Sequence, residues 1–281
     1  MKRVAGFLLV LAVALAIAAF FYARYYGMIP RHIYESVAPQ VPTFSKPAVL
    51  VFNKTNGFIH HDGIPAADEM LTQLAKQQGW DVFITDNAAV HNQQDLSRFQ
   101  LVVWNNVSGD VLTVEQRKSM QNWIEQGGGW LGLHASGGDF SYEWDWYVDT
   151  LLGAQFIGHT MSPQFQDAQV LVADSNVLLT AHIPKRWTVT QEEWYAFDRN
   201  PREQGYEILL TIDESSYITV GEDFFGMRDR MAGEHPLVWR HKQGQGRVFY
   251  SAIGHTPATY QIPEYRDLIN KSMVWALNAQ P

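Results

Sequence analysis

The sequence predicts an α/β domain with a doubly wound, mostly parallel sheet, an added antiparallel β section and one N-terminal transmembrane helix. Three observations lead to this prediction. Apolar runs alternate with segments of helical periodicity between residues 48 and 134, which is typical of strands joined by crossover helices. The second half has several strand-like runs with few helices between them. The first 26 residues contain an apolar stretch long enough to span a bilayer.

The apolar stretch covers residues 4–22 and follows Lys2 and Arg3. At ~1.5 Å per residue it nearly matches a hydrocarbon core of ~30 Å, whereas the apolar part of a cleaved signal peptide has only about 7–15 residues. We therefore expect a retained signal-anchor over residues 1–26. Cleavage at the Ala16-Ile17-Ala18 motif is the alternative.

Positive charge sets the expected orientation of this helix. Lys2, Arg3 and the amino terminus precede it, against Arg24 and Arg31 after it. The positive-inside rule places the N-terminus in the cytoplasm and the domain in the periplasm or outside the cell. Residues 27–46 are rich in proline and predict a linker, so that the folded domain covers residues 47–281.

The first half of the domain contains the signals of a parallel sheet. A helix is expected after Pro65 and ends near Gly79, and a second begins with the capping box of Thr113 and Gln116. Continuous apolar runs indicate strands buried on both faces, at residues 48–52, 81–85, 101–104 and 130–133.

The second half predicts antiparallel strands and one closing helix, over residues 264–277. The turn at residues 243–246 indicates a hairpin. The expected strands are residues 168–172, 207–212, 237–240 and 246–251.

Composition narrows the classes of function. The net charge is −8 and there is no basic run after residue 3, so a nucleic-acid partner is not expected. The chain has no cysteine, which excludes disulfides, cysteine-ligated metals and a thiol nucleophile. Ten tryptophans and twelve tyrosines offer flat faces that suit a sugar ring, although the favoured interpretation is that these large aromatic residues fill the core and its rim.

Candidate site residues follow the strands of the parallel sheet, since ligands bind beyond the carboxyl ends of such strands. His60 follows the first strand, Asn105 the third and His134 the fourth. Residues 132–136 have the strand–turn shape of a nucleophile elbow, but its tip is histidine rather than serine. Imidazole suits proton transfer or metal ligation; the alternative is a buried structural histidine.

Other histidines and acids lie in later loops, notably His159, Glu193, His235 and His255. Neutral imidazoles with one carboxylate could form a Zn²⁺ or other divalent site, although no H-x-x-x-H or H-x-H pair supports it. The alternative is acid–base chemistry with Glu193 as general base. The metal candidates are His134, His159, His255 and Glu193.

Several segments together resemble the ThuA-like (trehalose-utilisation) family, which has the class I glutamine amidotransferase-like fold. The resemblance covers essentially all of residues 47–281. It rests on the order and spacing of these segments: Gly57-Phe58-Ile59-His60, residues 127–134, Gly158-His159, residues 192–195, residues 235–239, residues 246–250 and Gly254-His255.

The resemblance implies that His134 stands at the position of the amidotransferase cysteine, which argues against amide hydrolysis. It also implies sugar metabolism that involves keto-sugar intermediates. Two positions depart from the family pattern. Glu192-Glu193 replaces the usual Asp-Glu pair, and Ile59 replaces an arginine. The lost cation puts the substrate in doubt, and trehalose itself is not assumed.

Two hypotheses follow. The first is an enzyme, or former enzyme, acting on a carbohydrate or its keto derivative. The second is a non-catalytic carbohydrate- or protein-binding domain displayed on a membrane. Histidines more than ~10 Å apart would favour the second, because metal–imidazole bonds are only about 2.0–2.1 Å. In the first, the catalytic residues are His134, Glu193, His159 and His255, and the substrate-binding residues are His60, Asn105, Trp194, Tyr195 and His235, with Trp130 as a further sugar-stacking candidate.

Overall fold

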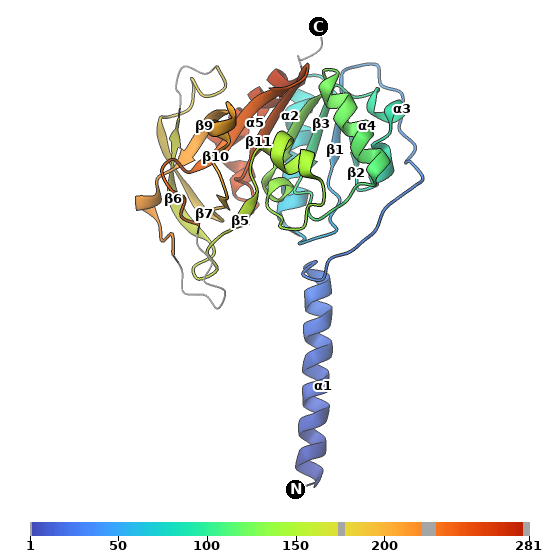
Figure 1. The fold of residues 1–281 in the computed structure, drawn as a ribbon, viewed down its shortest axis with the longest axis vertical. Helices are drawn as coiled ribbons and strands as arrows, with labels where there is room; N and C mark the ends of the chain where they lie inside the picture. Colours follow the sequence, from blue (N-terminus) through green and yellow to red (C-terminus); the bar gives the residue numbers. More distant parts are fainter. Residues whose placement is uncertain (1, 174–177, 221–228, 278–281) are drawn as a thin grey trace.

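A computed structural model of the chain describes residues 2–173, 178–220 and 229–277. Within them, nine strands form one sheet in the order β2-β1-β3-β4-β11-β10-β9-β6-β7 (Figure 1). The strands of this sheet are β1 (Ala48–Phe52), β2 (Asp81–Thr85), β3 (Leu101–Asn105), β4 (Gly129–Leu133), β6 (Gln166–Val172), β7 (Arg186–Glu192), β9 (Glu207–Ile212), β10 (Pro236–Gln243) and β11 (Gly246–Ser251).

One half of the sheet is parallel, because β2, β1, β3, β4 and β11 all run in the same direction. Helices cover both of its faces. Side chains of α2 (Gly63–Gln77) and α5 (Pro263–Leu277) pack with one face of the strands, and those of α3 (Gln93–Leu96) and α4 (Val114–Glu125) with the other. Burial on both faces explains why β1, β3 and β4 are continuous apolar runs.

The other half of the sheet is antiparallel. β10 pairs with β11 through a hairpin in which Gln243 lies opposite Gly246, and β9, β6 and β7 follow with antiparallel pairing. The prediction of a mostly parallel sheet with an added antiparallel section is therefore confirmed. The remaining elements are β5 (Phe156–Gly158) paired with β8 (Ala196–Phe197), a π-helix at Trp146–Leu152, and single 3₁₀ turns at Ala88–Val90, His134–Gly137, Pro201–Gln204, Glu214–Ser216 and Thr259–Gln261.

The N-terminal helix α1 (Lys2–Tyr25) projects away from the domain (Figure 1). Its segment Val4–Tyr25 is long and apolar enough to cross a membrane, a property that signal sequences share. Residues 27–46 contain no helix or strand, and they are bonded to the domain surface. The Arg31 amide donates to the Asn56 carbonyl at 2.6 Å, and Glu35 pairs with Lys54 at 2.6 Å. The domain boundary at residue 47 stays a prediction.

A buried histidine in the core makes stability depend on pH. His91 donates from Nδ1 to the Ala88 carbonyl and accepts the indole N–H of Trp104 at Nε2, both at 3.2 Å. Burial lowers the pKa of His91 from 6.5 to about 4. The unfolded chain therefore takes up a proton at a higher pH than the folded one, so that stability falls as the pH drops from 6.5 to about 4.

We expect this titration to remove about 3 kcal/mol of stability between neutral pH and pH 4. Urea unfolding of the wild type and His91→Gln, followed over this pH range, measures it. The stability advantage of the wild type should shrink by that amount at low pH. A difference that is constant with pH would show that His91 does not titrate in this window.

Candidate functional site

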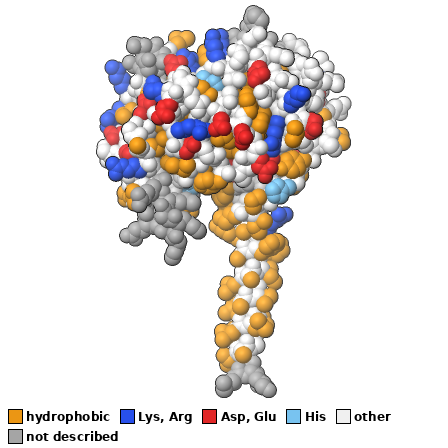
Figure 2. Space-filling view, in the orientation of Figure 1, with side chains coloured by type: hydrophobic (Ala, Val, Ile, Leu, Met, Phe, Trp, Pro, Cys, Tyr) orange, Lys and Arg blue, Asp and Glu red, His pale blue; other side chains and the backbone are white. Residues whose placement is uncertain are grey.

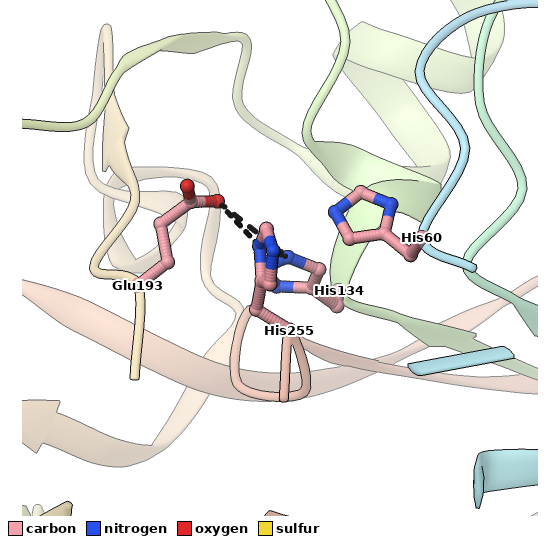
Figure 3. Close-up of side chains that lie close together, drawn as sticks. All are labelled: His60, His134, Glu193 and His255. Carbon is pink, nitrogen blue, oxygen red and sulfur yellow. Dashed lines mark hydrogen bonds and ion pairs between the residues drawn. The ribbon is translucent and has the colours of Figure 1, made fainter. Parts of the chain in front are cut away.

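Four ionisable side chains converge at the carboxyl edge of the parallel strands. His60 follows β1, His134 follows β4, His255 follows β11 and Glu193 follows the edge strand β7. One potential ligand atom from each lies within 4.8 Å of the others (Figure 3). The histidines are therefore gathered rather than scattered, and this favours the hypothesis of a chemical site over that of a bare scaffold.

Three of these atoms have the spacing of ligands that share one ion. His134 Nε2 lies 3.2 Å from His255 Nδ1 and 3.7 Å from Glu193 Oε2, and the last two atoms are 3.0 Å apart. In a tetrahedral site with bonds of about 2.0–2.1 Å, neighbouring ligands are about 3.3–3.4 Å apart. The observed separations bracket this value, so the three atoms can bind one divalent ion with small adjustments.

The backbone and its neighbours fix the orientation of His134. The residue has a φ of +44°, the left-handed conformation of an elbow. Its Nδ1–H donates to the Ala252 carbonyl at 2.7 Å, which leaves a lone pair on Nε2. A carbonyl partner on the second nitrogen is usual for metal-ligating histidines. The Tyr195 hydroxyl donates to Nε2 at 2.8 Å, so an ion bound there would replace this hydroxyl as the partner of Nε2.

His60 is the fourth member of the group and lies on the side of His134 and His255 that is opposite to Glu193 (Figure 3). Its ring centroid lies 4.8 Å from that of His134 and 4.5 Å from that of His255. The side chain is buried, and its Nδ1 has no hydrogen-bond partner within the described ranges. An unpaired buried polar atom costs about 1–3 kcal/mol. A bound ion, water or substrate group would satisfy it.

Glu193 is ionised in this environment. Burial alone would raise its pKa, but the hydrogen bond from His255 and the charges of His255, His159 and His134 outweigh burial and lower the pKa to about 2. Its outer oxygen Oε1 accepts from Gln164 at 2.6 Å and lies 3.3 Å from His159 Nδ1. The site thus holds a carboxylate whose second oxygen, Oε2, faces the imidazoles.

The histidines differ in their pKa. Burial lowers the pKa of His60 and of His134 well below the ordinary value. Burial also acts to lower the pKa of His255, but the hydrogen bond and charge of Glu193 outweigh it and raise this pKa. Burial therefore favours the neutral imidazole at His60 and His134, whereas Glu193 favours the protonated form of His255.

Glu192 holds two segments of the site in place through hydrogen bonds to their backbone. It was not among the predicted site residues. It is fully buried, and its Oε1 accepts the backbone N–H groups of Glu193 and His255, both at 2.9 Å. Its Oε2 accepts the Thr259 hydroxyl. One carboxylate therefore ties together the two segments that present Glu193 and His255. The sequence signals for Glu192 were its position beside Glu193 and the family's usual Asp-Glu pair at these two positions.

Comparison with known proteins identifies the family. The model of the ThuA family, described as trehalose utilisation, matches residues 48–276. The chain belongs to the ThuA family. Among curated proteins the comparison finds no match.

Solved structures show the same fold. A ThuA-like protein from Bacteroides uniformis is 21% identical, with a TM-score of 0.69 over 85% of this chain and 95% of its own. A second, from Parabacteroides merdae, is 19% identical, with a TM-score of 0.58 over 83% and 90%. A cytoplasmic protein of Salmonella typhimurium is 11% identical, with a TM-score of 0.54 over 82% and 99%. These similarities confirm the predicted ThuA-like fold.

Several predicted site residues of this ThuA domain lie outside the cluster. Asn105 is buried and donates to the Ile64 carbonyl and to Asp68, which fixes α2 to β3. His235 lies between Glu214 and the Tyr195 carbonyl. The interpretation of Asn105 and His235 as substrate-binding residues thus finds no support, because protein groups already occupy their polar atoms.

The predicted sugar-stacking role of Trp194 is also at odds with the structure. Successive side chains of an extended segment point to opposite sides, so Glu193 and Tyr195 reach the site while Trp194 enters the core. There its indole N–H donates to the Gln166 carbonyl. Trp130 is a core residue as well. Tyr195 does lie at the site, but it stacks on His134 with centroids 4.4 Å apart.

A cleft of about 260 Å³ gives access to one side of the cluster. His60 and His255 lie in its wall. Its aromatic residues come from other parts of the chain than those predicted, namely Tyr25, Tyr26, Phe58 and Phe165. Phe165 meets the ring of His255 edge-on, with centroids 4.8 Å apart.

Proposed function

We propose that this ThuA domain is anchored to a membrane by α1 and acts on a carbohydrate or keto-sugar with the help of a divalent metal ion. The observation that carries the proposal is the spacing of His134 Nε2, His255 Nδ1 and Glu193 Oε2, at 3.0–3.7 Å from one another. The family description, trehalose utilisation, supports a saccharide as the substrate class. The apolar length of Val4–Tyr25 supports the anchor.

Each residue has a distinct part in this proposal. His134, His255 and Glu193 hold the ion, which would polarise a carbonyl or hydroxyl oxygen of the substrate. His60 faces the remaining position from the side of the cleft, and no hydrogen bond or ion pair joins it to the other three within the described residues. Three protein ligands with one open position are typical of catalytic rather than structural zinc sites.

Proton transfer falls to residues at the edge of the cluster. His159 is partly exposed and its Nδ1 lies 3.3 Å from the outer oxygen of Glu193, so it places an imidazole between this buried carboxylate and solvent. The Tyr195 hydroxyl, released from His134 Nε2, can donate a hydrogen bond to a substrate oxygen. The absence of cysteine from the sequence excludes the thiol chemistry of amidotransferases.

Elemental analysis of the full-length protein in detergent, after incubation with Zn²⁺, Mn²⁺ or Mg²⁺ and dialysis, tests the metal site. We expect about one equivalent of a divalent ion per chain. His134→Ala and Glu193→Ala should lose it, and His60→Ala should retain it.

His182→Ala is the matched control, since His182 pairs with Asp267 away from the cluster, and its metal content should equal that of the wild type. A wild-type protein that retains none of these ions would contradict the metal site. If His60→Ala and His134→Ala lost the metal ion to the same extent, the site would be a closed site with four protein ligands, as in structural zinc sites.

The second candidate function is a carbohydrate-binding domain without catalysis. The deep burial of His134 and Glu193 favours it, because the wall of the cleft contains His60 and His255 but neither of these two side chains. A protein that binds the ion and a saccharide but leaves keto-sugars and disaccharides unchanged would support this candidate.

A further inference from the structure

The end of α1 forms part of the wall of the cleft. Tyr25 and Tyr26 line the cleft together with His60 and His255. Tyr25 is also the last residue of the segment Val4–Tyr25 that is long and apolar enough to cross a membrane. The cleft therefore begins where the apolar helix ends. If α1 spans a bilayer, the cleft lies at the level of the lipid head groups.

This helix end is firmly attached to the loop that carries His60. The Ile59 amide donates to the Tyr26 carbonyl at 2.9 Å, and His61 Nε2 donates to the Tyr25 carbonyl at 2.9 Å. The Tyr25 and His61 rings stack with centroids 4.0 Å apart. At Gly27, a Cβ would lie 2.0 Å from the Gly57 carbonyl oxygen, so the next turn of chain also touches the loop. These contacts fix the direction in which the cleft opens relative to α1.

Exposed apolar side chains continue from α1 onto the same edge of the domain (Figure 2). Phe140 and Phe165 have 60% and 36% of their surface exposed. Phe165 packs on His255, and Phe140 packs on Phe156, which in turn meets His159. An apolar rim beside a membrane anchor is the kind of surface that enters the head-group layer.

The size of the cleft limits its ligand. At about 260 Å³ it is slightly smaller than most ligand pockets, which range over roughly 300–1,000 Å³. It has room for one sugar ring but not for acyl chains. The rings of Tyr26, Phe58 and Phe165 offer apolar faces, and Asp62 and the histidines offer polar groups, the combination that suits a sugar.

We propose that the cleft binds the sugar head group of a lipid-linked saccharide that lies in the same membrane as α1. The inference rests on the proposed function for the saccharide class and adds the source of the substrate. The lipid chains stay in the bilayer, the apolar rim contacts the head-group layer, and the first sugar ring enters between Tyr26 and Phe165 toward His60 and His255.

The test uses the full-length protein in phosphatidylcholine nanodiscs that contain or lack a glucosyl-diacylglycerol. Hydrogen–deuterium exchange of residues 58–63 and 255–257 reports occupation of the cleft. At a glycolipid content of ten times its dissociation constant, we expect exchange there to slow about tenfold. Free glucose or trehalose in the buffer at the same molar amount should change it little.

Phe165→Ala should remove most of this protection. Val114→Ala is the control, since Val114 is an exposed apolar residue on α4, and it should behave as the wild type. Equal protection by free trehalose would overturn this inference and leave the proposed function intact. Absence of protection by any saccharide, with the metal ion bound, would overturn both the inference and the saccharide assignment but not the metal site.

Discussion

Replacing Glu192 by alanine is expected to lower the free energy of unfolding by about 3–5 kcal/mol. The buried carboxylate accepts hydrogen bonds from the amides of Glu193 and His255 and from the Thr259 hydroxyl. Its removal leaves three buried donors without a partner, and hydrogen bonds to charged groups contribute about 1.5–3 kcal/mol each. Burial of the carboxylate, which raises the pKa of Glu192, offsets part of this sum. Urea unfolding followed by circular dichroism measures the loss.

Two further variants separate this effect from a general loss of charge. Glu192→Gln keeps the shape and one acceptor oxygen, so its loss of stability should be smaller. Glu115→Ala removes a carboxylate of the first turn of α4 and should change stability by less than about 1 kcal/mol. If Glu192→Ala were no worse than Glu115→Ala, the carboxylate would not be what joins the two segments.

The parallel half of the fold could be predicted from the sequence because its signals are local. Strands buried on both faces produce continuous apolar runs, as in β1, β3 and β4. The capping box of Thr113 and Gln116 is formed as predicted. These features depend on neighbouring residues only, so one sequence is enough to detect them.

The antiparallel edge was harder to predict. β7 has only alternate residues buried over part of its length, and it includes polar and charged residues. β5 and β8 have three and two residues, too few for a periodic pattern. Their pairing depends on contacts between distant segments, which local patterns do not contain.

The candidate site shows the same division. His134 and His60 could be placed at the sheet edge because each follows a predicted strand. The contact of Glu192 with the His255 amide spans 63 positions of the chain, and that of Tyr25 with His61 spans 36. No local pattern indicates such contacts. Trp194 was predicted to face the site, but its side chain lies in the core. The same limit explains this error, since no strand was predicted around residues 186–195.

We expect Gly254→Ala to lower both the free energy of unfolding of the domain and the affinity of its metal site. Gly254 has a φ of +138°, a conformation nearly restricted to glycine. A Cβ there would lie 2.6 Å from the Tyr260 hydroxyl and 3.4 Å from the Cβ of His134. Tyr260 is fully buried and donates to the Gly254 carbonyl while accepting from Asn106, so it has little freedom to move.

The backbone strain costs about 1–3 kcal/mol, and the steric overlap adds about 1–3 kcal/mol. Because His255 is the next residue, we also expect the affinity for the divalent ion to fall about 10–100-fold, as when supporting residues of metal sites are changed. Urea unfolding and metal titration of the same preparation measure both effects.

Gly79→Ala is the matched control for the strain. Gly79 also has a positive φ, +76°, but an added Cβ meets nothing within 4 Å. It should lose about 1–2 kcal/mol and keep its metal affinity. Adding Tyr260→Phe to Gly254→Ala removes the overlapping oxygen but leaves the strain, so stability should recover only in part. A Gly254→Ala protein with the same stability and metal affinity as Gly79→Ala would contradict this prediction. It would show that the loop relaxes around the added Cβ. The close packing of Gly254, Tyr260 and His134 would then not be what holds His255 in place.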